Sequence, residues 1–109
     1  MVRGYEIEIA PTGFGSLKSV KNKKLRHEVT KVIDGLAHAP EKQGKALLGP
    51  LEGVRSVRAA RDRFRILYRV DTRARIVSVL LVGERRSGHD ADIYVLARKL
   101  LATFTSKAD

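Results

Sequence analysis

The chain has 109 residues, a formal net charge of +10 and no cysteine, and 43% of its residues are hydrophobic. This length suits one domain with a single hydrophobic core, which we expect to span residues 1–109. The composition excludes a disordered chain, a disulfide framework and a thiolate metal site. The longest apolar run, Ile76–Val82, falls well short of the roughly 20 residues that a membrane-spanning helix needs.

The N-terminal residues and the histidines bear on compartment and cofactor. The sequence opens directly into a strand-like segment, without the cationic lead and apolar stretch of a secretory signal, so we expect a cytoplasmic protein. His27, His38 and His89 are scattered along the chain and lack the paired spacing of a zinc site. We therefore expect neither a metal nor another cofactor.

The first 40 residues predict one strand and two helices. Apolar residues alternate with other residues over 5–10, which is typical of a strand with one buried face. Apolar side chains then recur every three positions over 14–20, and at clear helical spacing over 25–36. Asn22 is a candidate cap for the second helix, and Pro40 stops it. We expect the two helices to form a hairpin that packs on one face of a sheet.

The rest of the chain predicts a connection, three strands and a final helix. Residues 40–53 are rich in glycine and proline, and we interpret them as a connection that leucines hold against the core. Apolar patterns then predict strands over 54–60, 64–70 and 75–83, joined closely enough for an antiparallel meander. An apolar stripe over 93–104 predicts a helix that Asp90 or Asp92 caps.

Together these elements predict an α+β fold, in which an N-terminal strand and helical hairpin pack on a four-stranded, mainly antiparallel sheet, with a C-terminal helix. Ile76–Val82 is apolar on both faces, as expected of a strand that is covered on both sides, so we place it in the middle of the sheet. Arg65 and Arg69 alternate with apolar residues on the preceding strand and should point to the same face.

Positive charge is concentrated in the predicted sheet. Residues 55–86 contain ten arginines, no lysine and three acidic residues. Arginine presents a planar fork that binds two phosphate oxygens at once and stacks on bases, so this density favours a phosphate backbone or an acidic protein as partner. The alternative is a solvated basic surface, which would more often be lysine-rich. The lysine-rich outer face of the second helix fits that alternative better.

Several arginines fall where a meander brings strand ends and the loop after the sheet onto one concave surface. If that surface holds RNA, the simplest cleavage without a metal is attack by a ribose 2′-hydroxyl on its adjacent phosphate. The reaction needs a base, an acid and positive charge around the phosphorane. A structural role, such as a cross-strand ion pair, is the alternative for each residue. The residues grouped here are Arg58, Arg65, Arg69, Arg85, Arg86, and the proton-transfer candidates His89 and Tyr94.

Five short segments form a signature through their order and spacing. They are LLGPLEG at 47–53, VRSVR at 54–58, RFRILYRV at 63–70, VGERR at 82–86 and DIY at 92–94. The most telling part is the basic, aromatic, arginine, apolar, apolar, tyrosine series at 63–68, followed by Val-Gly-x-Arg. These segments resemble the RelE/ParE superfamily of bacterial toxins from type II toxin–antitoxin systems, and the likeness covers nearly the whole chain.

The resemblance implies a small toxin that inhibits growth and is held inactive by a cognate antitoxin, with which it can form a hetero-oligomer. In the RelE-like branch, which we favour, such toxins cut mRNA on the ribosome without a metal. Matching motif positions imply catalytic roles for Arg58, Arg65, Arg85 and Tyr94. The further residues that we predict to bind RNA are Arg55, Arg61, Arg63, Arg69, Arg86, His89 and Lys45.

Two other functions fit the sequence. A non-enzymatic toxin of the ParE kind would inhibit DNA gyrase through protein contacts on the same fold, although the arginines and Tyr94 favour the nuclease. A basic RNA-binding module without toxicity would need a platform of exposed aromatic side chains. The chain has three phenylalanines, three tyrosines and no tryptophan, most of them in the predicted apolar stripes.

Overall fold

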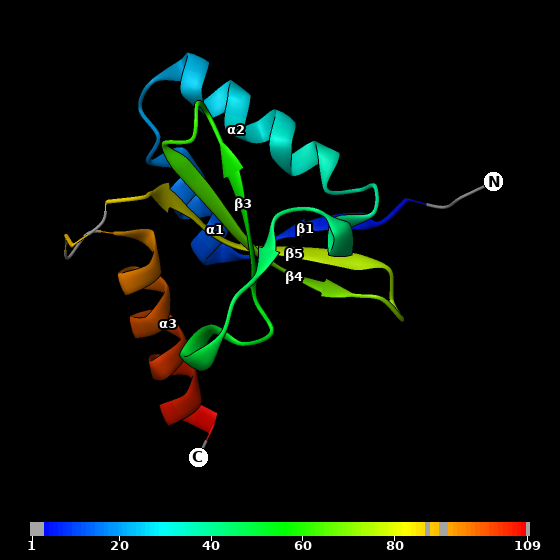
Figure 1. Ribbon diagram of the computed structural model, residues 1–109, viewed down its shortest axis with the longest axis vertical. Coiled ribbons are helices and arrows are strands. Elements are labelled where there is room, and N and C mark those ends of the chain that lie inside the picture. Colours follow the sequence, from blue (N-terminus) through cyan, green and yellow to red (C-terminus); the bar gives the residue numbers. More distant parts are fainter. Residues whose placement is uncertain (1–3, 87, 90–91, 109) are drawn as a thin grey trace.

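The computed structural model describes residues 4–86, 88–89 and 92–108, which form an α+β fold with one sheet between helices (Figure 1). The predicted N-terminal strand, two helices, meander and C-terminal helix are all present. In chain order the elements are β1 (Glu6–Ile9), α1 (Pro11–Lys18), α2 (Lys23–Gly35), the 3₁₀ turn η1 (Pro40–Lys42), β2 (Lys45–Ala46), the 3₁₀ turn η2 (Gly49–Leu51), β3 (Arg55–Ala59), β4 (Phe64–Asp71), β5 (Ile76–Glu84) and α3 (Ile93–Ala108).

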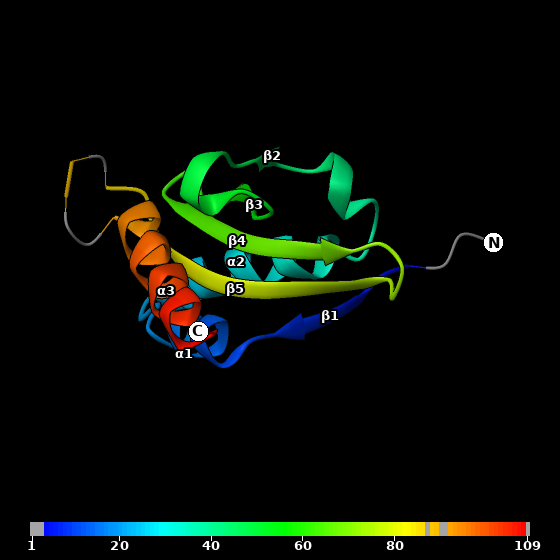
Figure 2. The ribbon, with the colours of Figure 1, turned by 90° about the horizontal axis from the view of Figure 1, so that it is seen from below.

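The sheet has five strands in the order β1-β5-β4-β3-β2, so the prediction of four strands was wrong (Figure 2). The additional strand, β2, pairs Lys45 and Ala46 with β3 and is too short to show a period in the sequence. β3, β4 and β5 form the predicted antiparallel meander, and β1 joins β5 in parallel. β4 is the central strand, so the prediction that Ile76–Val82 lies in the middle of the sheet was wrong. β5, which contains these residues, lies between β4 and β1.

A β-bulge in β5 places two consecutive apolar residues on the same face of the sheet. Leu67 of β4 lies opposite Leu81, but the next residue, Tyr68, lies opposite Val79, so Leu80 has no partner on β4. As a result, Leu80 and Leu81 both pack toward α3, whereas Val79 packs toward α2. Apolar side chains of β5 therefore belong to the buried clusters on both faces of the sheet.

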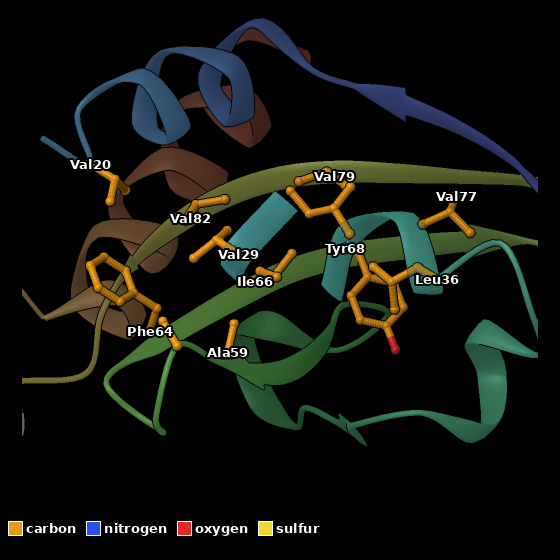
Figure 3. Packing of buried hydrophobic residues seen from close by; sticks show 12 residues of the cluster. Val20, Val29, Leu36, Ala59, Phe64, Ile66, Tyr68, Val77, Val79 and Val82 are labelled. Carbon is orange, nitrogen blue, oxygen red and sulfur yellow. The ribbon is translucent and has the colours of Figure 1, made fainter. Parts of the chain in front are cut away.

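The core on the α2 side is built around Tyr68 (Figure 3). This side chain is fully buried beside Leu36, and its hydroxyl lies 2.9 Å from the carbonyl oxygens of both Pro40 and Gln43. Burial raises the pKa of the Tyr68 phenol, so the group stays protonated and serves as a donor. Asn22 Oδ1 accepts from Leu25 N at 3.1 Å, which confirms the predicted cap of α2.

The opposite face of the sheet is covered by α3 and by the segment before β3. Leu51, Val54, Leu67, Ile93 and Ala97 form its buried cluster. Not every residue of the apolar stripe predicted over 93–104 belongs to this cluster. Leu96 is 42% exposed, and the side chain of Phe104 lies outside the described part of the chain. In the described residues, no helix is both long and apolar enough to cross a membrane.

α1 lies along the edge of β5, where β1 ends. Thr12 Oγ1 donates to the Leu80 carbonyl oxygen at 2.7 Å, and Ser16 Oγ accepts from Val82 N at 2.9 Å. The helix therefore satisfies backbone groups that a neighbouring strand would otherwise bind. Pro11 begins this helix, because proline is favoured at the first helical position. Phe14 begins the apolar pattern seen over residues 14–20, yet its side chain is 54% exposed and lies outside the core.

Replacing Gly13 by alanine should destabilise the protein, because the new Cβ atom would lie 2.5 Å from the Val79 carbonyl oxygen. Overpacking of this kind costs about 1–3 kcal/mol, and urea denaturation should show a loss of that size in the free energy of unfolding. Gly15→Ala is the matched control in the same helix, since nothing lies within 4 Å of its new Cβ. Equal stability of the two variants would contradict the packing of α1 against β5.

Candidate functional site

A concave site of about 460 Å³ opens beside the first turn of α3, and we call it the arginine hollow. It brings together all four residues that the sequence predicted to be catalytic, and Lys45, which it predicted to bind RNA. The residues that line it are Gly44, Lys45, Ser56, Val57, Arg58, Arg65, Arg85 and Tyr94.

Cross-strand pairing places the cationic side chains of the hollow. Arg58 of β3 lies directly opposite Arg65 of β4, so both side chains leave the sheet on the same face. Arg85 follows β5, and its N–H donates to the Arg63 carbonyl oxygen at 2.9 Å, which extends the pairing of β4 and β5 by one residue. Tyr94 comes from the first turn of α3.

The turn between β3 and β4 holds two of these arginines through Asp62. Arg58 Nε lies 3.3 Å from Asp62 Oδ1, and Arg65 Nη1 donates to the Asp62 backbone oxygen at 2.7 Å. Ala60, Arg61 and Asp62 all have positive φ, at 50°, 57° and 71°. Such residues cost about 1–2 kcal/mol each, so the turn is strained. The Arg58 side chain is 72% exposed, which leaves its guanidinium accessible to a ligand.

Tyr94 is fixed at both ends of its side chain. Its hydroxyl forms a 2.8 Å hydrogen bond with Ser56 Oγ, and Ser56 is 3% exposed. The Arg85 guanidinium carbon lies 5.0 Å from the centre of the Tyr94 ring, as in a cation–π contact. Ser56 was not among the residues predicted from the sequence, although it lies two positions before Arg58 on β3 and therefore faces the same side.

Asp92 anchors this end of the sheet to α3. Its carboxylate accepts from Arg85 Nη1, Arg86 N and Tyr94 N, and the residue is 2% exposed. Burial alone would raise the pKa of Asp92, but these hydrogen bonds and the Arg85 charge outweigh it and hold the pKa below its usual value. Tyr94 is the second residue of α3, and its N–H donates to Asp92, so Asp92 caps α3 as predicted. The other candidate, Asp90, lies outside the described residues.

The remaining predicted RNA-binding residues do not line the arginine hollow. Arg63 and Arg86 both contact Glu84, at 3.4 and 3.1 Å. Arg55 faces the α2 side of the sheet and donates to the Gln43 carbonyl oxygen from Nε and Nη2. The structure thus divides the arginines of residues 55–86 among several surfaces. The other three of these predicted residues are exposed and do not line the hollow: Arg61, Arg69 and His89.

A second concavity, of about 680 Å³, lies between the start of α2 and α3, and we call it the amphipathic groove. Apolar side chains that line it include Leu25, Phe64 and Leu96, and its cationic residues include Arg63 and Arg86. Where residues are described, no group of three or more histidine, cysteine, aspartate or glutamate side chains is arranged to hold a metal.

Comparison with known proteins identifies the family. A model described as the ParE toxin of the type II toxin–antitoxin system parDE matches residues 14–88. The chain therefore belongs to the ParE toxin family, within the RelE/ParE superfamily of type II toxins, which confirms the resemblance seen in the sequence. A search of curated proteins found no match.

Solved structures support the same superfamily. A chain of the toxin–antitoxin complex RelBE2 from Mycobacterium tuberculosis is 28% identical, with a TM-score of 0.68 over 75% of this chain and 99% of that one. A mutant of the E. coli toxin RelE in the free state is 14% identical, with a TM-score of 0.67 over 89% and 95%. A chain from the ParDE system of P. aeruginosa is 15% identical, with a TM-score of 0.62 over 73% and 95%. The last two share the fold.

The buried Asp92 carboxylate should make stability depend on pH. Its pKa is lower in the folded protein than in the unfolded chain, where it is about 3.9, so the ionised form stabilises the fold above that pH. Asp92→Asn keeps a capping oxygen but loses the charge, and should cost about 1–3 kcal/mol at neutral pH. This gap should narrow as the pH falls below about 4, because the unfolded wild-type chain then takes up a proton at Asp92, and the folded protein does so only at a lower pH. Denaturation curves of both proteins across this range test it, and a constant gap would contradict it.

Proposed function

We propose that this toxin is a cytoplasmic, ribosome-dependent mRNA endonuclease that needs no metal and acts through one domain, residues 1–109. The observation that carries the proposal is the convergence of Arg58, Arg65 and Arg85 on one hollow beside the Tyr94 phenol. Guanidinium groups from separate strands can contact several oxygens of one phosphate. The 28% identity with a chain of a RelBE2 complex is consistent with the RelE-like branch.

In the proposed reaction, a ribose 2′-oxygen bonds to the adjacent phosphorus, and the bond from that phosphorus to the 5′-oxygen of the next nucleotide breaks. The 2′-hydroxyl gives up its proton to a base, and the departing 5′-oxygen receives one from an acid. Arg58, Arg65 and Arg85 stabilise the negative charge that accumulates on the phosphorane. We assign proton transfer to Tyr94, because it lines the hollow whereas His89 does not.

A protein antitoxin is the second partner that we propose, with a toxin–antitoxin hetero-oligomer as the resting state. RelBE2 and the RelBE proteins of E. coli and Pyrococcus horikoshii were crystallised as toxin–antitoxin complexes. The amphipathic groove suits a segment that offers apolar side chains to Leu25, Phe64 and Leu96 and acidic ones to Arg63 and Arg86.

Inhibition of DNA gyrase without any cleavage of RNA is the second candidate function. The family model favours it, because its description is that of a ParE toxin. Such a toxin acts through protein contacts and does not need a phenol and three guanidinium groups around one phosphate. The two candidates therefore differ in whether single changes in the arginine hollow abolish toxicity.

Arg58→Ala should strongly slow mRNA cleavage while leaving the protein folded. Removal of one preorganised charge-stabilising group typically lowers a rate about 100- to 1,000-fold, whereas an exposed ion pair contributes only about 0–1 kcal/mol to stability. Arg73→Ala is the matched control, since Arg73 is exposed in the turn between β4 and β5, away from the hollow. RNA ends mapped after induction of each protein provide the measurement.

The same cultures should be assayed for trapped gyrase–DNA complexes. Intact mRNA together with such complexes would overturn the nuclease proposal and favour the gyrase inhibitor. Equal cleavage by the Arg58 and Arg73 variants would show that the arginine hollow is not the cleavage site.

Leu96→Asp should weaken binding of the antitoxin, for which the product of a short neighbouring reading frame is the natural test partner. Leu96 lines the amphipathic groove and is 42% exposed, so the change should affect the partner more than the fold. We expect a loss in affinity of about tenfold or more, as for an apolar contact at the centre of an interface. Leu48→Asp is the control, because Leu48 is 82% exposed outside the groove. Equal affinities would place the antitoxin elsewhere.

A further inference from the structure

Asp92 lies behind the arginine hollow and does not line it. Its side chain is 3% exposed, yet it accepts hydrogen bonds from three donors of Arg85, Arg86 and Tyr94. Two of these residues, Arg85 and Tyr94, present their side chains in the hollow. The carboxylate is therefore placed to hold residues of the site and not to touch a ligand.

The two carboxylate oxygens of Asp92 have separate tasks. Oδ1 accepts from Arg85 Nη1 and from Arg86 N, whereas Oδ2 accepts from Tyr94 N at 3.1 Å and so caps α3. A cap alone needs only one oxygen, which serine or asparagine would also supply. The second oxygen and the negative charge serve Arg85, whose guanidinium stacks on the Tyr94 ring.

We propose that Asp92 is a positioning residue of the arginine hollow. It holds the Arg85 guanidinium against the Tyr94 ring, and it fixes Tyr94 itself by capping the helix that carries it. Ser56 completes the arrangement from the opposite side through its 2.8 Å hydrogen bond to the Tyr94 hydroxyl. The effect of Asp92 on RNA rests on the proposed nuclease function, whereas its effect on Arg85 can be tested without RNA.

Asp92→Asn separates the two tasks. The amide keeps one oxygen for Tyr94 N, but it places an NH₂ donor against the donors of Arg85 and Arg86. Asp71→Asn is the matched control, because it removes the same charge. Asp71 Oδ1 also accepts from two backbone N–H groups, those of Arg73 and Ala74, in the exposed turn between β4 and β5.

The first measurement is the mobility of the Arg85 guanidinium by ¹⁵N NMR, with its signal assigned by its loss in Arg85→Lys. In the wild-type protein this group should be restricted, whereas the guanidinium of the exposed Arg69 should move freely. Asp92→Asn should release Arg85, and Asp71→Asn should leave it restricted. A wild-type Arg85 as mobile as Arg69 would overturn the proposal, and that result does not depend on whether Asp92→Asn folds. An Arg85 that stays restricted in Asp92→Asn would also overturn it.

The second measurement is cleavage of ribosome-bound mRNA. Because Asp92 does not touch the RNA, Asp92→Asn should lower kcat about 10- to 100-fold while KM changes by less than about threefold, as for a misplaced catalytic group. Asp71→Asn should match the wild type. Unchanged kcat in a protein whose Arg85 has become mobile would overturn the positioning role in catalysis. If the wild-type protein cleaves no RNA, the proposed nuclease is wrong, and the Arg85 mobility alone decides the inference.

Discussion

The burial of both faces of the sheet decides where this protein can present charge. α2 covers one face of β4 and β5, and Ile93 and Ala97 of α3 cover the other. A guanidinium in the middle of either face would lose its hydration without a matching partner, which is costly. Arg58, Arg65 and Arg85 therefore converge where strands end and α3 begins. The same apolar cover that stabilises the fold thus concentrates cationic groups at one end of the sheet.

The parts of the fold that have their own period could be predicted from the sequence, and the parts that depend on distant partners could not. α2 shows its apolar stripe and its Asn22 cap, and the meander shows strands joined by short turns. β2 has two residues and exists only because Ser56 and Arg55 of β3 pair with it. The bulge at Leu80 likewise has no local pattern in the sequence. One of its contacts comes from a distant residue, because Thr12 of α1 donates to the Leu80 carbonyl oxygen.

The residues of the site could likewise be predicted only in part. Arg58, Arg65, Arg85 and Tyr94 could be grouped because strand ends and the loop after a meander meet in space. The density of arginines in the sequence does not show, however, which surface each side chain reaches. Arg85 and Arg86 are adjacent, yet the first lines the arginine hollow while the second lines the amphipathic groove beside Glu84. Asp92 could be predicted as a helix cap, but its contact with Arg85 could not. Asp62 contacts Arg58 and Arg65 from a left-handed turn, which no local pattern predicts.

Residues of α3 line both the arginine hollow and the amphipathic groove, and this limits how a bound partner could inhibit the site. Tyr94 lines the hollow and Leu96, two residues later on α3, lines the groove. A segment bound in the groove would press on the helix that carries Tyr94 and leave the exposed Arg58 uncovered. Inhibition from the groove alone would therefore have to act by moving Tyr94 and its capping contacts. Inhibition by covering would instead need a second, acidic segment over the hollow, where the cationic side chains outnumber the carboxylates.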